Sequence, residues 1–344
     1  MNLKRWSWLL FAPPLLVIFL GLIYAAIPKV GYCFDNEFDE SGERLYVTAG
    51  KKGGHVFKIS PSASLVLVDT YFESGYYRYI EMVGNKAYIA NGDRGLEVLD
   101  ISEDSPKPVW AQHGSKGYGI DIVGDIAYLA SNELGLQIFD ITNPHAPVLT
   151  GAFETGGRAW DVWVKETYAY MVDRDLGLVV FDISAPSQPT VVSSLSWVED
   201  PMAEMIDGAS EFVYIASGEN GLIVIDVSDP WKPVTTFEYD SGPDSWREGV
   251  NLRGSTLYLT MDDSLSREEN GLHIFDLLDP SSPRLLSKFP ITDGVEDISV
   301  AGSHLALSNT LSGIVLLDVH DPTKVILIDT HPSLFWRFFT KFLG

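Results

Sequence analysis

The chain has 344 residues, of which 46% are hydrophobic and 12% aromatic, and this composition argues against a disordered protein because a packed core is available. It carries 47 acidic against 24 basic residues, a net charge of -23, which strongly disfavours nucleic-acid binding through phosphate contacts. The single cysteine, Cys33, excludes an internal disulfide framework and a cysteine-rich zinc site.

Residues 6–27 form an uncharged apolar stretch of 22 residues, which as a helix would be about 33 Å long and would span a bilayer. We therefore expect a membrane anchor over residues 1–29. A cleaved signal peptide is the alternative, but its apolar stretch is about 7–15 residues, and Tyr24 stands where cleavage after Ala26 needs a small residue. Because Lys4 and Arg5 precede the stretch, we expect a single-pass protein with a cytoplasmic N-terminus. The rest of the chain would then be extracytoplasmic, in the periplasm or at the cell surface.

A repeated unit of a little over 40 residues fills the chain between residues 30 and 331. Its clearest part is a glycine followed by an apolar run that ends in Asp, as in GLEVLDIS from Gly95. In the first copy Lys58 replaces the Asp, and a tyrosine stands seven residues before the glycine in most copies, as Tyr88 stands before Gly95. The seven copies have their glycines at Gly53, Gly95, Gly135, Gly177, Gly221, Gly271 and Gly313.

Each unit contains four short apolar runs that are rich in Val, Ile, Tyr and Phe, lack helical periodicity and are separated by turn residues, as strands are. Four short strands in a unit of this length are typical of a propeller blade. The sequence therefore predicts an all-β fold, a seven-bladed β-propeller of four-stranded blades over residues 30–331. An open solenoid is the rival, but it would need capping units with a polar face.

The recurring unit G-L-x-V-φ-D-[IV]-S-x-P-x-x-P, where φ is apolar, resembles the LVIVD-repeat family of bacterial and archaeal surface or secreted propellers. The resemblance covers about residues 33–331 and rests on six good copies. It implies a propeller that works as a cell-surface module, and it implies no particular activity.

An acidic residue stands in each unit near the expected start of the inner strand, at the mouth of the central channel. We expect each carboxylate to accept hydrogen bonds from the backbone amides of a neighbouring loop. The alternative is a cation site, with Ca²⁺ as the candidate, because crowded carboxylates repel one another unless a cation, hydrogen bonds or protonation relieves them. No other cofactor is expected. The acids are Asp35, Glu81, Asp121, Asp161, Glu204, Glu248 and Asp297.

Aromatic and basic residues share the same expected loops. Exposed Tyr, Trp and Arg at a concave mouth are typical of protein or sugar recognition, and the alternative is that the rings only plug the channel. The aromatic candidates are Tyr76, Tyr77, Tyr118, Trp160 and Trp246, and the basic candidates are Arg78, Arg158 and Arg247.

Residues 332–344 form an aromatic and basic tail. On a helix, one side would gather Phe335, Phe338, Phe339 and Phe342 with the neighbouring leucines, and the other side would carry Arg337 and Lys341. This pattern favours a short amphipathic helix that contacts the membrane interface through residues 334–343, with Trp336 among the contacts. The alternative is that the tail covers a blade edge.

No catalytic motif stands out: the seven histidines are scattered, and H-E-x-x-H, G-x-S-x-G and a phosphate-binding glycine loop are all missing from the sequence. We therefore expect a non-catalytic, membrane-anchored extracytoplasmic propeller that serves as an interaction or assembly module for another membrane or envelope protein. The alternative is a metal- or ligand-binding protein, or a hydrolase-type enzyme, that uses the acids of the channel mouth. Carbohydrate binding is a weaker alternative.

Overall fold

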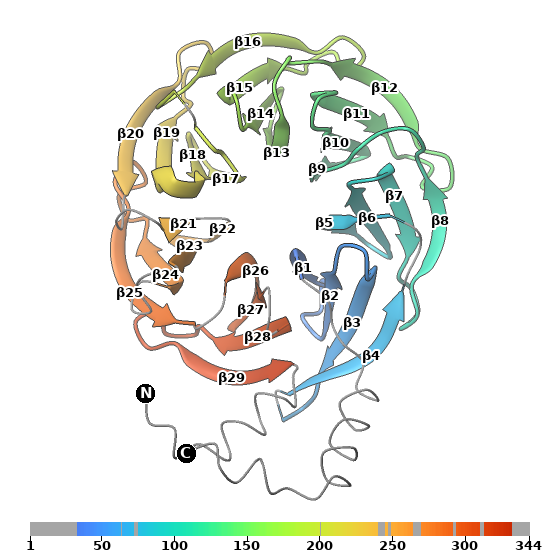
Figure 1. Ribbon diagram of the computed structural model, residues 1–344, viewed down its shortest axis with the longest axis vertical. Helices are drawn as coiled ribbons and strands as arrows, with labels where there is room; N and C mark the ends of the chain where they lie inside the picture. The colour runs from blue at the N-terminus through green and yellow to red at the C-terminus, as the bar shows by residue number, and fades with distance from the viewer. Residues whose placement is uncertain are drawn as a thin grey trace, which may run out of the picture. The chain divides into compact units, whose positions relative to one another are not determined.

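The computed structural model describes residues 33–62, 64–71, 75–199, 201–239, 245–246, 249–263, 270–291, 294–309 and 313–331. Their strands form seven antiparallel sheets around a common centre, so the prediction of an all-β, seven-bladed propeller is confirmed (Figure 1). The described part of the propeller runs from Cys33 to His331. In every blade the first strand lies next to the centre and the fourth on the outside.

The first four blades each take four consecutive strands of the chain. Blade 1 contains β1 (Asp35–Phe38), β2 (Arg44–Thr48), β3 (Gly54–Ile59) and β4 (Leu65–Tyr71); blade 2 contains β5 (Tyr77–Val83), β6 (Lys86–Asn91), β7 (Gly95–Asp100) and β8 (Lys107–Ala111). Blade 3 contains β9 (Gly119–Val123), β10 (Ile126–Ala130), β11 (Leu136–Asp140) and β12 (Val148–Phe153); blade 4 contains β13 (Ala159–Lys165), β14 (Tyr168–Asp173), β15 (Gly177–Asp182) and β16 (Thr190–Leu195).

The last three blades follow the same plan, except that the inner strand of blade 6 comes in two pieces that both pair with β23. Blade 5 contains β17 (Met205–Ala209), β18 (Phe212–Ala216), the 3₁₀ turn η3 (Gly218–Asn220), β19 (Leu222–Asp226) and β20 (Val234–Tyr239). Blade 6 contains β21 (Ser245–Trp246), β22 (Val250–Arg253), β23 (Thr256–Asp263), β24 (Gly271–Asp276) and β25 (Arg284–Pro290); blade 7 contains β26 (Val295–Ala301), β27 (His304–Asn309), β28 (Gly313–Asp318) and β29 (Ile326–His331).

The repeated sequence features have local structural causes. The repeat glycine has a positive φ in all seven copies, for example 83° at Gly177, where a Cβ would also lie 2.5 Å from the Leu195 carbonyl oxygen, so another residue would be strained. The Asp that ends the third strand accepts a hydrogen bond from the backbone amide two residues later, as Asp182 does from Ser184 at 2.9 Å. These contacts start the tight turn into the outer strand.

The hydrophobic core lies between adjacent blades. One cluster, for example, joins Ile138 of blade 3 to Met171 and Phe181 of blade 4, and the next joins Val180 of blade 4 to Ile223 of blade 5. Both faces of the second and third strands are therefore buried, as in β14 and β15, which explains why these strands are mostly apolar.

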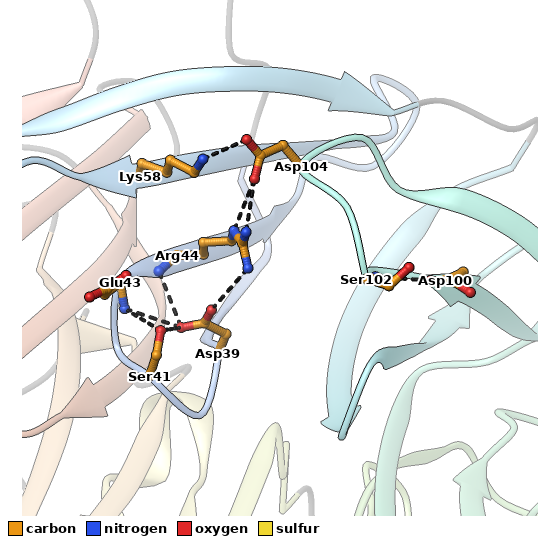
Figure 2. Close-up of polar contacts among 8 residues, drawn as sticks. All are labelled: Asp39, Ser41, Glu43, Arg44, Lys58, Asp100, Ser102 and Asp104. Atoms are coloured by element: carbon orange, nitrogen blue, oxygen red, sulfur yellow. Dashed lines mark hydrogen bonds and ion pairs between the residues drawn. The ribbon is translucent and has the colours of Figure 1, made fainter.

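Blades 1 and 2 are also joined by a group of ion pairs near the outside of the sheets (Figure 2). Lys58, which replaces the repeat Asp on β3, contacts the Asp104 carboxylate in the turn after β7, and the Arg44 guanidinium on β2 contacts the same carboxylate at 2.9 Å. Asp39 holds the other side of Arg44 at 3.6 Å. The departure of the first copy from the repeat therefore supplies a cation for the neighbouring blade.

The expected anchor over residues 1–29 and the expected tail over residues 332–344, including Phe335, Trp336, Phe338, Phe339 and Phe342, lie outside the described residues. Within the described ranges, none of the helical segments has the length and apolar character needed to cross a bilayer.

Candidate functional site

The inner strands bring one residue from each of six blades to one end of the central channel, which we call the channel mouth. Arg78, Trp160 and Glu296 each occupy an extra position in a β-bulge near the start of their inner strand. In blades 1, 3 and 5 the equivalent residue comes immediately before the inner strand, and its backbone amide donates a hydrogen bond to the last residue of the second strand. These residues are Phe34, Tyr118 and Glu204. We call these six residues the mouth ring.

The Arg78 guanidinium lies among aromatic rings from four blades. Its Cζ atom is 4.2 Å from the ring centre of Tyr118, 4.9 Å from that of Trp160, 5.4 Å from that of Tyr76 and 5.6 Å from that of Phe34. The rings also contact one another, with centroids 4.6 Å apart for Tyr118 and Trp160. We call these five residues the Arg78 cluster.

A second arginine, Arg174 in the turn after β14, lies on the Trp160 ring with its Cζ atom 3.5 Å from the ring centre. It forms an ion pair with Glu204, which is buried. Burial raises the pKa of Glu204, and the Arg174 charge opposes that shift. Arg78, Trp160, Arg174 and Glu204 line one pocket of about 240 Å³ together with Phe34, Tyr79 and Glu296.

Two other predicted recognition residues, Tyr77 and Arg158, do not belong to this cluster. Tyr77 is fully buried and donates a hydrogen bond from its hydroxyl to Glu97 at 3.0 Å, so its expected exposure at the mouth was wrong: it packs in the blade interior next to the bulge. Arg158 is exposed and its guanidinium binds Asp175. The side chain of Trp246, and all of Arg247, lie outside the described residues.

The predicted acids occupy three levels of the channel instead of one ring. Glu204 belongs to the mouth ring. The second level lies one residue further along the inner strand than the mouth ring and contains Asp35, Asp161 and Asp297. Each of these acids pairs with the residue two positions after the repeat tyrosine, or after Ala306 in the last copy. Glu81 and Asp121 lie two residues deeper, opposite the repeat tyrosines. Glu37 and Asp207 lie at the same level and were not among the predicted acids. Glu248 lies outside the described residues.

Most of these carboxylates accept hydrogen bonds from backbone amides, but these amides belong to the inner strand of the next blade and not to a neighbouring loop, where we expected them. The Asp161 carboxylate, for example, accepts from the Val162 amide at 2.8 Å and from Ile206 of blade 5 at 3.0 Å. Four other carboxylates accept a hydrogen bond from a backbone amide of the next blade in the same way: Asp35 from Ile80 (2.6 Å), Asp121 from Val164 (2.6 Å), Asp207 from Leu252 (2.7 Å) and Asp297 from Asn36 (3.4 Å). The acids therefore hold neighbouring inner strands together.

Burial raises the pKa of every acid on the two deeper levels, and in most of them hydrogen bonds from the backbone oppose the shift. The pKa rises to about 8 for Asp161, about 7 for Asp207 and about 6 for Asp121. Burial and the neighbouring Asp297 carboxylate raise the pKa of Asp35 well above its ordinary value. The channel interior is thus unfavourable for negative charge.

In the described part of the chain, His, Cys, Asp and Glu side chains form no group of three or more that could hold a metal ion. The amide contacts of Asp35, Asp121, Asp161 and Asp297 give these carboxylates a structural role, so the geometry favours the mouth ring over the acids as the recognition site.

The mouth ring could have been found from the repeat register. Arg78, Tyr118, Trp160 and Glu204 each stand ten residues before the repeat tyrosine of their unit. Glu81, Asp121 and Asp207 stand seven residues before it. The predicted acids include residues of both spacings, and Asp207 is not among them although it has the second spacing. Arg174 carries no comparable signal, because it belongs to a turn whose residues vary between copies.

The fold is shared with solved propellers at low sequence identity. A chain of a mitotic checkpoint complex is 12% identical, with 86% of this chain and 92% of that chain covered at a TM-score of 0.67. Sqt1 from Saccharomyces cerevisiae is 10% identical, with 88% and 87% covered at 0.63, and BamB from Moraxella catarrhalis is 12% identical, with 83% and 82% covered at 0.55. No curated protein matches the chain by sequence.

The family model described as the LVIVD repeat matches four segments of the chain: 74–108, 116–155, 156–196 and 208–241. These segments correspond to blades 2, 3, 4 and 5, and the remaining blades have the same strand order. The chain therefore contains four LVIVD repeats within a seven-bladed β-propeller, as the resemblance predicted.

Proposed function

We propose that the chain is a membrane-anchored, extracytoplasmic propeller that binds a protein partner at its channel mouth. The observation that carries this proposal is the Arg78 cluster: arginine and aromatic side chains from four blades meet beside a pocket on a rigid ring. Arginine, tyrosine and tryptophan supply most of the binding energy in many protein interfaces.

The low-identity structural neighbours support this role only through their fold. One of these neighbours is a chain of a mitotic checkpoint complex, and a propeller offers the same kind of rigid platform here. The anchor and the location are proposed from sequence alone, because residues 6–27 carry no charge over a length that spans a bilayer.

The interface is tested on the full-length chain, purified from native membranes in mild detergent together with any protein that accompanies it. We expect the wild type to retain a stoichiometric membrane or envelope protein. Trp160→Ala should lose this protein, because it removes the ring between Arg78 and Arg174. Trp231→Ala is the matched control, since Trp231 is 63% exposed in the turn before β20, on the outer side of blade 5.

Retention of the partner by Trp160→Ala, with an unchanged circular dichroism spectrum, would show that the mouth is not the interface.

The anchor is tested separately by alkaline carbonate extraction of membranes. We expect the full-length chain to stay in the membrane pellet, and its release into the supernatant would contradict the proposed anchor.

A further inference from the structure

The Arg78 side chain has nitrogen donors that no acceptor among the described residues uses. The contacts of its guanidinium are with the rings of Phe34, Tyr76, Tyr118 and Trp160. Across the described ranges it forms neither a hydrogen bond nor an ion pair through its side chain. In a chain with 47 acidic residues, an arginine whose guanidinium makes no direct contact with a described carboxylate is unexpected, all the more because Glu204 and Glu296 line the same pocket.

Arg174 adds a second donor on the same pocket. One end of its guanidinium binds Glu204, whereas its Nε atom is buried without a hydrogen-bond partner in the described part of the chain. A buried N–H group without an acceptor costs free energy, which an entering acceptor would recover. Arg78 and Arg174 lie against the same Trp160 ring, so their donors belong to one small region.

The surrounding rings decide which anion fits. Aromatic faces hold a guanidinium by its plane and leave its N–H edge available for a planar, bidentate acceptor. A carboxylate has that geometry. Glu204 and Glu296 also line the pocket, and Glu296 has interactions of its own. Because two carboxylates are already present, a single negative charge is better tolerated than the higher charge of a phosphate.

We propose that this pocket binds a carboxylate, which a protein partner supplies from its C-terminus or from an Asp or Glu side chain. The inference rests on the proposed interaction function for the source of the carboxylate. The choice of a carboxylate as the ligand follows from the N–H donors of Arg78 and Arg174 that have no acceptor among the described residues. The volume of about 240 Å³ suits the end of one peptide segment rather than a folded domain.

The test measures binding of small probes to the full-length protein by ligand-observed NMR. N-acetylglycine represents a peptide C-terminus and N-acetylglutamate α-amide represents an acidic side chain; N-acetylglycinamide and N-acetylglutamine amide are their neutral counterparts. We expect at least one acid to bind at least tenfold more tightly than its amide, and the acid that binds identifies the source. Equal binding of each acid and its amide, or equally tight binding of inorganic phosphate, would overturn the proposal.

Variants test the residue assignment. Arg78→Gln should weaken binding of the acid at least tenfold, and Arg78→Lys should also weaken it, because lysine keeps the charge but loses the planar fork. Arg284→Gln is the control, since it removes the same charge from an exposed residue at the start of the outer strand β25. Unchanged binding in both Arg78 variants would overturn the assignment. If no acid binds and Trp160→Ala still releases the partner, the carboxylate inference fails and the interaction function stands.

Discussion

The ion pair between Arg174 and Glu204 sits below the aromatic surface of the mouth, where neither charge is well solvated. The side chains are 18% and 6% exposed, respectively. Removing one member of such a pair leaves the other charge buried without a counter-charge, which costs more than the pair itself contributes. We expect Glu204→Gln to lower the free energy of unfolding by about 2 kcal/mol in urea denaturation at pH 7.

Glu211→Gln provides the comparison, because Glu211 is exposed in the turn between β17 and β18 and its replacement leaves the mouth unchanged. We expect that variant to stay within about 0.5 kcal/mol of the wild type. A Glu204→Gln protein as stable as Glu211→Gln would mean that Arg174 finds sufficient solvation without its partner.

The residues of the mouth also show what a single sequence can and cannot predict. The repeat register places Tyr118 and Trp160 at equivalent positions of adjacent blades, so a closed propeller brings their side chains into contact. Tyr77 and Arg78 are neighbours in the sequence, yet the bulge in β5 sends one into the blade and the other into the pocket. Composition carries no signal for that bulge, and the approach of Arg174 depends on the conformation of a variable turn.

At the level of elements, closing the ring is the step that the repeat alone does not explain. Blade 1 consists entirely of β1 to β4 and blade 7 entirely of β26 to β29, so no described strand from one end of the propeller completes the sheet of the other. The two blades meet through β1 and β26 instead. The sequence predicted seven units, and the contact from a channel acid to the next blade recurs here between Asp297 and Asn36, but the side-chain contacts of Asn36 with blade 7 have no counterpart in the repeat.

Asn36 on β1 is the centre of this junction and is 1% exposed. Its amide nitrogen donates to Ser308 Oγ at 3.0 Å, and its amide oxygen accepts from Ser299 Oγ at 2.6 Å. Both serines belong to blade 7. We expect Asn36→Ala to lower the free energy of unfolding by about 1–3 kcal/mol, because it leaves two buried hydroxyl groups without these partners.

Hydrogen exchange can locate this effect. If the loss acts on the closure between blades 1 and 7, the amides of β1 and β26 should exchange about tenfold faster in Asn36→Ala, whereas those of β14 should change little. Asn85→Ala, in an exposed turn of blade 2, is the matched control. Uniform acceleration in every blade would show that the closure does not open separately.

For the whole molecule, the carboxylates of the channel connect stability to pH. Glu81 lies where burial and the charges of Glu37, Asp121, Asp207 and Asp161 all act on it, and together they raise its pKa well above the ordinary value. Burial likewise raises the pKa of Glu37 to about 8. These acids hold their protons more tightly in the folded chain than in the unfolded one. The stability that these channel acids contribute is therefore fully present below about pH 4, their ordinary pKa, and is lost progressively as the pH rises from there to about 8.

We expect the melting temperature of the wild type to fall by roughly 5–10 °C between pH 5 and pH 8.5 at constant ionic strength and with a chelator present. Glu81→Gln tests the cause, because Glu81 forms no hydrogen bond with its side chain within the described residues and glutamine keeps its shape. This variant should melt higher than the wild type at pH 8.5 and equally at pH 5. Glu211→Gln should follow the wild type at both values. If the wild type instead gains stability with rising pH, the channel acids are charged without penalty, and a counter-charge must enter the channel when the ring folds.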